Sequence, residues 1–269
     1  MQKAKDLTVF LGVPLLVVAM LFMMSAGGSV TSTHGVEWYF QPNETHTPPQ
    51  VVDEVDFSPY SVLYCGDAAE KKVSLTFDAG FDNGCHTPIL DTLKEKGVQA
   101  SFFLDGNFLK QNEALVRRMA AEGHTIGNHT LHHADMTKLT DLATYRKEVE
   151  GWNELLQGYG IEPSGYFRFP CGKFSERALD YNGRLGLTAV FWSFAYYDWV
   201  ESDQPAPEAA LEKIMSRMHN GCVLLLHSTS QTNAEILGTL IDRLRAEGYE
   251  IVPLDTMNNS SLLPKDVIQ

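Results

Sequence analysis

The stretch Lys72–Gly97, KVSLTFDAGFDNGCHTPILDTLKEKG, decides the fold, because it predicts one complete step from strand to loop to helix. Its first six residues form a short, mostly apolar run of the kind found in buried strands. Thr87 and Pro88 suit the start of a helix, as N-cap and first-turn residue, and Gly97 suits its end. The segment therefore predicts a β/α unit.

The same unit recurs along the rest of the chain. Further apolar runs lie at 100–104, 124–128, 165–167, 188–193, 222–227 and 250–254. Helical patterns lie near 112–122, near 141–157, after Ser175, near 207–219 and up to Gly248. Thr232 and Glu235 form a capping box at the start of the last one. Alternating strands and helices predict an α/β fold with a covered parallel sheet, and the length fits a barrel of seven or eight units.

The N-terminus carries a separate signal. Lys3 and Lys5 precede an apolar run, Leu7–Met24, that contains Gly12 and Pro14. At ~1.5 Å per residue, a helix over this run extends roughly 27 Å, which barely crosses a bilayer. The run predicts either an uncleaved membrane anchor or a cleaved signal peptide. Both interpretations place the rest of the chain outside the cytoplasmic membrane.

Composition and pattern divide the chain into four parts. We expect a signal anchor or signal peptide at 1–27, a loosely packed linker or extension at 28–70, the β/α domain at 71–256 and a tail at 257–269. The net charge of −13, without a Lys/Arg cluster beyond the first residues, argues against nucleic acid as a partner. The four cysteines lack metal-type spacing and are expected as free or buried thiols. We expect a monomer without an organic cofactor.

Five polar residues each follow a short apolar run, namely Asp78, His129, Arg168, Asp198 and His227. Because the carboxyl ends of parallel strands meet at one edge, these side chains are expected to converge on one opening. An ionised Asp78 suits a general base on water, and a bidentate Arg168 would keep it charged. His227, with a pKa near neutrality, suits a general acid. Taken singly, a turn-capping aspartate and a buried structural histidine explain these two residues as well.

A histidine pair lies at His129 and His133. At a spacing of i, i+4 the two share one face of a helical turn and suit a shared Zn²⁺ or similar ion. A surface loop explains such a pair as well, and His132 is equally available. Trp199, beside Asp198, suits either sugar stacking or ordinary packing.

In this order and spacing, the motifs resemble those of the polysaccharide deacetylase family, also called the NodB homology domain or carbohydrate esterase family 4. The matching segments are TFDAG (76–80), HTLHH (129–133), RFP (168–170), DW (198–199) and LLH (225–227). The resemblance covers about residues 70–255. It implies a distorted (β/α) barrel and the hydrolytic removal of N-acetyl groups from polysaccharide amino sugars.

The resemblance also implies a role for each matching residue. The implied roles are Asp78 as catalytic base, His227 as acid, Arg168 as the residue that orients Asp78, His129 and His133 as metal ligands, and Asp198, Trp199 and Leu225 as substrate-binding residues. The family pattern thereby selects His133 over His132.

Two departures from the family pattern affect the metal site and the groove. The family's second aspartate, its third metal ligand, is Ala79 here, and Ala195 takes the first position of its DxxDW motif. A methyl group cannot coordinate an ion, so a divalent metal such as Zn²⁺ is expected to bind weakly. Asp82, three residues further along the loop, is an alternative ligand.

With these departures, the chain resembles a bacterial subgroup of the family, the delta-lactam-biosynthetic de-N-acetylases. The matching segments are TFDAGFDNG, EGHTIGNHTLHH, RFPCGKFSE and VFWSFAYYDW. The subgroup implies action on N-acetylmuramic acid of peptidoglycan, notably in the spore cortex. The alternatives are an N-acetylglucosamine or chitin-type deacetylase and a catalytically degenerate wall-binding protein. A Ser-His-Asp esterase is disfavoured because the sequence has no G-x-S-x-G segment.

Overall fold

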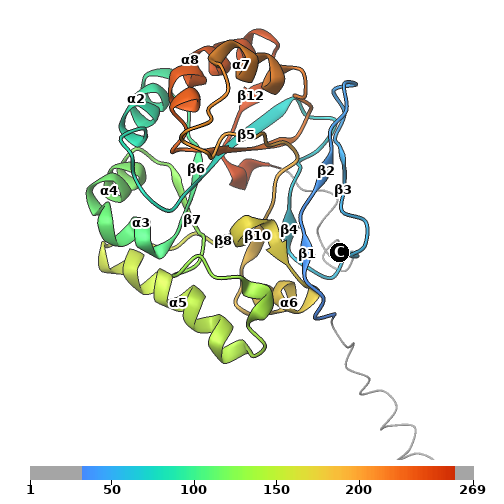
Figure 1. The fold of residues 1–269 in the computed structure, drawn as a ribbon, viewed down its shortest axis with the longest axis vertical. Helices are drawn as coiled ribbons and strands as arrows, with labels where there is room; N and C mark the ends of the chain where they lie inside the picture. The colour runs from blue at the N-terminus through green and yellow to red at the C-terminus, as the bar shows by residue number, and fades with distance from the viewer. Residues whose placement is uncertain (1–31, 258–269) are drawn as a thin grey trace, which may run out of the picture. The chain divides into compact units, whose positions relative to one another are not determined.

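The computed structural model describes residues 32–257, and their centre is a parallel β-sheet that curls into a distorted barrel (Figure 1). The strands, in spatial order, are β11 (Cys222–His227), β5 (Lys72–Ala79), β6 (Ser101–Leu104), β7 (Thr125–Asn128), β8 (Tyr166–Phe167), β10 (Thr188–Val190) and β4 (Val62–Leu63). β12 (Glu250–Ile251) adds to β5. All neighbours run parallel, which confirms the predicted α/β barrel.

The barrel closes along a weak seam. Two isolated bridges within residues 32–257 join the far end of the sheet back to β11. Cys65, just after β4, pairs with Cys222, and Phe194, just after β10, pairs with Leu224. A seam of single bridges, in place of a full strand pair, accounts for the distortion of the barrel.

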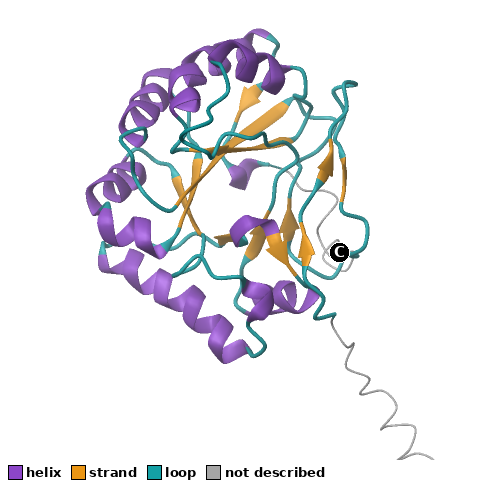
Figure 2. Ribbon diagram, viewed as in Figure 1, coloured by secondary structure: helices purple, strands orange, loops and turns teal. Residues whose placement is uncertain are grey.

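Helices follow the strands and form an arc around the outside of the barrel (Figure 2). They are α2 (His86–Lys96), α3 (Gly106–Gln111), α4 (Glu113–Ala121), α5 (Leu142–Gly158), α6 (Glu176–Arg184), α7 (Pro207–Met215) and α8 (Gln231–Ala246). Short 3₁₀ helices lie at η1 (Met136–Lys138), η2 (Pro170–Gly172) and η3 (Leu254–Thr256).

Two predicted helix starts are wrong by two residues. The N-cap of α2 is Cys85, two residues before the predicted N-cap Thr87, and the helix begins at His86. The N-cap of α8 is Ser230, whose side chain accepts the amide of Asn233. Thr232 is the second residue inside that helix, and its hydroxyl donates to the Pro205 carbonyl oxygen at 2.8 Å.

The segment expected as a loosely packed extension is folded onto the barrel. Its strands are β1 (Val36–Glu37), which pairs with β9 (Lys173–Phe174), β2 (Phe40–Gln41), which pairs with β3 (Gln50–Val51), and β4 of the main sheet. Trp38 is buried and stacks on Phe191 with ring centroids 4.2 Å apart. Apolar side chains between the prolines explain the tight packing, which differs from the expectation.

Some expectations fall outside the described residues, namely the anchor or signal peptide at 1–27 and the tail from residue 258. Between residues 32 and 257, no helix combines the length and the apolar character needed to cross a membrane. The four cysteines carry free thiols; Cys171 is exposed and the others are buried.

Candidate active site

Asp78 and His227 lie side by side at the carboxyl edge of the barrel. Asp78 is near the end of β5, His227 ends β11, and the two are register partners in parallel strands. Neighbouring strands lie ~4.8 Å apart, and residues in register point to the same face. The residues that precede both are buried, so a shift of register would turn these polar side chains into the core.

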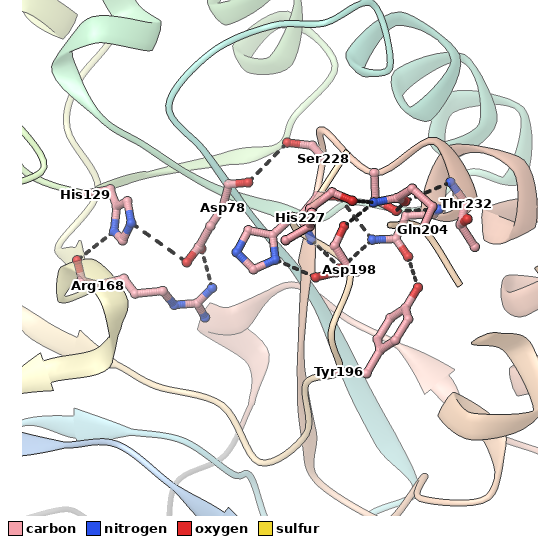
Figure 3. Close-up of polar contacts among 12 residues, drawn as sticks. Asp78, His129, Arg168, Tyr196, Asp198, Gln204, His227, Ser228 and Thr232 are labelled. Atoms are coloured by element: carbon pink, nitrogen blue, oxygen red, sulfur yellow. Dashed lines mark hydrogen bonds and ion pairs between the residues drawn. The ribbon is translucent and has the colours of Figure 1, made fainter. Parts of the chain in front are cut away.

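A buried cation holds Asp78. Arg168 Nη1 donates to Asp78 Oδ1 at 2.7 Å (Figure 3). His129 Nε2 lies 3.9 Å from Asp78 Oδ2. Burial, the largest single influence, would raise the pKa of Asp78, but the Arg168 guanidinium, together with the neighbouring His129 and His227, holds the pKa below its usual value. Asp78 is therefore a carboxylate at neutral pH, as a general base must be.

Arg168 makes a single contact with Asp78, so the predicted bidentate pair is wrong. Its Nη2 donates to Thr76 Oγ1 at 3.0 Å, and its Nε donates to the Val190 carbonyl oxygen at 3.1 Å. The guanidinium carbon lies 4.0 Å from the centroid of Phe103. The N–H donors of Arg168 bind several different acceptors because the fully buried guanidinium lies among backbone and hydroxyl oxygens of β5 and β10. Arg168 consequently fixes the angle of Asp78 through several anchor points.

A buried anion aligns His227. Asp198 Oδ1 accepts from His227 Nδ1 at 2.7 Å, and Asp198 Oδ2 accepts from the His227 amide at 2.9 Å. Asn233 Nδ2 donates to Asp198 Oδ2 at 2.6 Å, and the Tyr196 hydroxyl donates to Asn233 Oδ1. Burial, the largest single influence, lowers the pKa of His227, but the hydrogen bond and charge of Asp198, with a smaller contribution from Asp78, raise the pKa above its usual value. Since Nδ1 is held by Asp198, Nε2 is the nitrogen left for a substrate.

The two side chains of the DW segment have different environments. Trp199 is 51% exposed and lines the cavity beside His227. Asp198 is fully buried behind His227, and both of its oxygens are occupied. This burial does not fit the substrate-binding role expected for Asp198, and it places the carboxylate as a support of the acid.

His129 and His133 lie next to each other, with ring centroids 5.0 Å apart, and both line the cavity. His132 lies at the surface and pairs with a glutamate there. The helical turn expected for these residues is wrong, because Thr130 and His133 have left-handed φ values of 70° and 52°. Asn128 Oδ1 accepts the Thr130 amide at 2.8 Å, which stabilises a loop instead.

The side chains around His129 do not complete the three-ligand metal site of the family pattern. His129 Nδ1 bonds to the Arg168 carbonyl oxygen at 2.8 Å, which leaves Nε2 free, as in histidine ligands. Burial lowers the pKa of His129 to about 4, so the ring is neutral. The third position, however, is the methyl group of Ala79, which lines the cavity. Across residues 32–257, no three His, Cys, Asp or Glu side chains are grouped to hold a metal ion.

Asp82 does not replace the missing ligand. Its Oδ1 lies 2.7 Å from His86 Nδ1 and accepts the Gly84 amide at 3.0 Å. It is absent from the lining of the cavity that contains His129. The alternative ligand expected from the sequence is therefore wrong, because the loop directs Asp82 toward α2.

The sequence reasoning missed Asp105, which lines the same cavity. Its Oδ1 accepts the Phe108 amide at 2.7 Å and caps α3, and burial raises its pKa. A Cβ at Gly80 would lie 2.8 Å from Asp105 Oδ2, so this carboxylate lies directly against the loop after Asp78. Asp105 follows the apolar run 100–104, and the rule that found the other polar residues finds it too.

A cavity of about 710 Å³ connects these groups, a size typical of small-molecule sites. Asp78, His129, His133 and His227 supply its chemistry. Leu225 lies two residues before His227 on β11, hence on the same face, and also lines the cavity. Aromatic side chains line it further, including Phe81, 44% exposed, and Trp199. The cavity therefore offers a base, an acid and stacking surfaces in one opening.

Comparison with known proteins identifies relatives of the chain. The family model described as polysaccharide deacetylase matches residues 66–190. The chain is 35% identical over 242 residues to the peptidoglycan-N-acetylmuramic acid deacetylase PdaA of Bacillus subtilis, with 87% of this chain and 92% of the relative covered. It is 30% identical over 206 residues to a peptidoglycan-N-acetylglucosamine deacetylase of Bacillus cereus, with 75% and 74% covered.

The three-dimensional fold matches as well. The solved structure of Bacillus subtilis PdaA, a family 4 carbohydrate esterase, superposes with a TM-score of 0.80 at 35% identity. The match covers 84% of this chain and 97% of that structure. Similarity of this extent, together with the family match, means that this chain belongs to the polysaccharide deacetylase family and is a hydrolase of non-peptide carbon–nitrogen bonds.

Proposed function

We propose that this protein removes N-acetyl groups from amino sugars of peptidoglycan, with N-acetylmuramic acid as the preferred sugar. The observation that carries the proposal is the in-register pair of Asp78 and His227 on one cavity. Arg168 keeps the first ionised, and Asp198 favours the protonated form of the second. The muramic acid and glucosamine deacetylases to which the chain is similar support this class of substrate.

The two side chains divide the proton transfers of amide hydrolysis. Asp78 takes a proton from water while the water oxygen attacks the acetyl carbonyl carbon, and a tetrahedral intermediate forms. His227 Nε2 then gives its proton to the amide nitrogen, the carbon–nitrogen bond breaks, and acetate and a free amine leave. General acid and base groups of this kind typically contribute ~10²–10⁴-fold each. The chain's own side chains account for both transfers.

The rest of the cavity suits an acetylated sugar. Leu225 is 4% exposed and adjoins the acid, which fits contact with the acetyl methyl group. Trp199 and Phe81 present exposed ring faces at the same opening, which fits stacking against a sugar ring. Exposed aromatic side chains beside a catalytic pair favour a glycan over a small soluble amide.

Sequence similarity favours muramic acid over glucosamine as the proposed substrate. The identity to the muramic acid deacetylase is higher than that to the glucosamine deacetylase, and the match covers more of both chains. The subgroup resemblance around Ala79 points the same way. We propose that the substrate is a glycan strand whose stem peptide has been removed, so that the deacetylated amine can close a delta-lactam with the free lactyl carboxylate. The glucosamine-type deacetylase is the second candidate, since the Bacillus cereus relative favours it.

Mass spectrometry of digested glycan strands tests the proposal. Strands with and without stem peptides are incubated with the protein, cut by a muramidase and analysed. We expect acetyl loss from muramic acid in stem-free strands, and none with the Asp78→Asn variant. Acetyl loss from glucosamine or chitin oligomers alone would decide for the second candidate. Retention on cell walls without any acetyl loss would indicate a degenerate wall-binding protein.

We also propose that the protein acts outside the cytoplasmic membrane, held there by residues 1–27 or released after their cleavage. Lys3, Lys5 and the apolar run Leu7–Met24 support this location, and the subgroup resemblance supports a role in the spore cortex. Cell fractionation with N-terminal sequencing tests it. Full-length protein in the membrane fits an anchor, protein in the medium that starts near residue 28 fits a signal peptide, and recovery from the cytoplasm contradicts both.

A further inference from the structure

A second chain of hydrogen bonds lies directly behind the cavity. Ser228 Oγ lies 2.8 Å from His86 Nε2, and His86 Nδ1 lies 2.7 Å from Asp82 Oδ1. The order and the distances match those of a Ser-His-Asp hydrolase triad. Ser228 directly follows the acid His227, whereas Asp82 and His86 lie on the loop and first helical turn after the base Asp78.

Burial excludes Ser228 as a nucleophile. The side chains of Ser228 and His86 are fully buried, and neither residue lines the cavity. A nucleophile must reach the reacting carbon, and here the cavity is lined by the neighbours of Ser228, namely His227 and Thr229. Because these three residues have the geometry of a triad but no access to substrate, we interpret them as a structural link between the loop after Asp78 and the turn after His227.

The hydrogen bonds of this link run in one direction. The Asp82 carboxylate only accepts, so His86 Nδ1 carries the hydrogen of that bond. Burial lowers the pKa of His86, so its ring is neutral and Nε2 accepts from the Ser228 hydroxyl. The Ser228 amide in turn donates to the Asp78 carbonyl oxygen at 3.4 Å. The backbone of the base and the residue after the acid are thereby joined through one connected chain.

Neighbouring contacts join the same two loops. Asn83 Nδ2 donates to the Thr229 carbonyl oxygen at 2.7 Å. Cys85 Sγ lies 3.5 Å from Gln231 Oε1. The loop at 80–86 is therefore attached at successive points to the turn at 228–231, and the bond between His86 and Ser228 is the buried part of this attachment.

We propose that Asp82, His86 and Ser228 form a positioning brace, which holds the loop after Asp78 and the turn after His227 at a fixed separation. Asp78 and His227 both lie at strand ends, so the segments that follow them set where their side chains point. None of the three brace residues lines the cavity. Since a misplacement of ~1 Å can cost ~10²-fold in rate, such a brace affects the turnover number. Its catalytic consequence rests on the deacetylation proposed above.

Deletion of one hydroxyl tests the brace against a matched control. Ser228→Ala removes the donor to His86. Tyr145→Phe removes another buried hydroxyl, which donates to Asn182 at 2.7 Å between α5 and α6. We expect both variants to lose thermal stability, because each leaves a buried partner without its hydrogen bond. We expect kcat to fall ~10-fold with KM unchanged in Ser228→Ala, and to stay at the wild-type value in Tyr145→Phe.

A double variant separates positioning from stability. His86→Leu combined with Ser228→Ala removes both partners of the buried bond, so no unpaired polar group remains between them and Tm is expected to recover in part. The brace predicts that kcat stays low in the double variant. Recovery of kcat together with Tm would overturn the proposal, because the bond would then act through stability alone.

Hydrogen exchange supplies a readout that does not depend on activity. In Ser228→Ala, we expect the amides at 78–86 and 227–231 to exchange at least ~10-fold faster than in the wild type, and Tyr145→Phe to leave them unchanged. A wild-type protein that deacetylates no glycan contradicts the proposed function, while the exchange rates still decide the brace. Unchanged exchange in both segments, or an unchanged kcat in an active Ser228→Ala variant, overturns it.

Discussion

The two sides of the active site reach opposite protonation states by the same means. Beside Asp78, burial raises the carboxyl pKa, and the cation of Arg168, with smaller contributions from His129 and His227, brings the pKa below its usual value. Beside His227, burial lowers the imidazole pKa, and the anion of Asp198, with a smaller contribution from Asp78, brings the pKa above its usual value. Burial opposes the charged form in both cases. The sign of the buried partner, rather than the depth of burial, decides which residue is the base and which the acid.

The two sides differ in what remains when the catalytic group is removed. Without the Asp78 carboxylate, the fully buried guanidinium of Arg168 faces only neutral acceptors, namely Thr76 and backbone carbonyl oxygens. Without the His227 ring, Asp198 keeps the amide of residue 227 and the Asn233 side chain, and, because that ring is 26% exposed, its removal also opens the carboxylate to water from the cavity. Loss of the base is therefore expected to cost activity and stability, and loss of the acid chiefly activity.

The largest effect is expected for Asp78→Asn. The amide cannot take a proton from water, so acetate release is expected to fall ~10²–10⁴-fold. The uncompensated guanidinium is expected to lower Tm as well, by a mechanism that costs ~3–5 kcal/mol when one partner of a buried ion pair is removed. Asp91→Asn is the matched control, since it breaks an exposed pair with Arg118 and should leave activity and Tm close to wild type. A folded Asp78→Asn protein with near-wild-type rates would remove Asp78 from its role.

His227→Ala is expected to lower acetate release by ~10²-fold or more, because the departing amine stays unprotonated. Its Tm is expected to change less than that of Asp78→Asn, which is the asymmetry between the two sides. His132→Ala deletes an exposed ring from the neighbouring loop and serves as the control with unchanged activity. Equal losses of Tm in the two catalytic variants would show that the buried partners do not differ in this way.

Much of this site follows from the sequence, because strand order alone brings distant residues to one edge. Asp78, His129, Arg168 and His227 each end an apolar run, and parallel pairing places them together without further information. The same reasoning located the strands and most helices. Sequence patterns therefore predict the features that depend on strand direction and on the burial of apolar runs, namely the sheet, most helices and the edge where the site lies.

The rest of the site depends on which way a loop residue turns, which the pattern does not show. Asp198 and Trp199 are adjacent, yet one is fully buried and the other is 51% exposed. The contact of Asp198 with Asn233 spans 35 positions and has no local signal. The expected helical turn at His129 failed because a side chain of Asn128 bonds to the backbone two residues on. Hydrogen bonds between loops, rather than periodicity, set these details.

Asp198→Asn tests the acid side through its pH dependence. His227 acts in its protonated form, so activity is present below its pKa and is lost as the pH rises through it. The Asp198 carboxylate raises that pKa, and the neutral amide removes this effect. We therefore expect the alkaline limb of kcat/KM to move to lower pH, and activity above the limb to fall ~10-fold for every pH unit that the limb moves. The acid limb, set by Asp78, should stay in place, and an alkaline limb that also stays would contradict the support role of Asp198.

The smallest effect concerns Ala79, the residue that follows Asp78 on β5. Its methyl group lines the cavity with His129 and His133, where the family pattern has a charged ligand. Two imidazoles alone hold a divalent ion less firmly than two imidazoles with a carboxylate, so wild-type affinity for Zn²⁺ is expected to be weak. Ala79→Asp is expected to tighten Zn²⁺ binding by ~1.4 kcal/mol or more, which is at least tenfold in Kd. Calorimetric titration of the metal-stripped proteins measures this change directly, without reference to activity.

Ala79→Asn is the matched control, because it adds an oxygen of similar reach without the charge and should gain less. Tight binding by the wild type, or an equal gain in both variants, would show that the charge missing at this position is not what limits the metal.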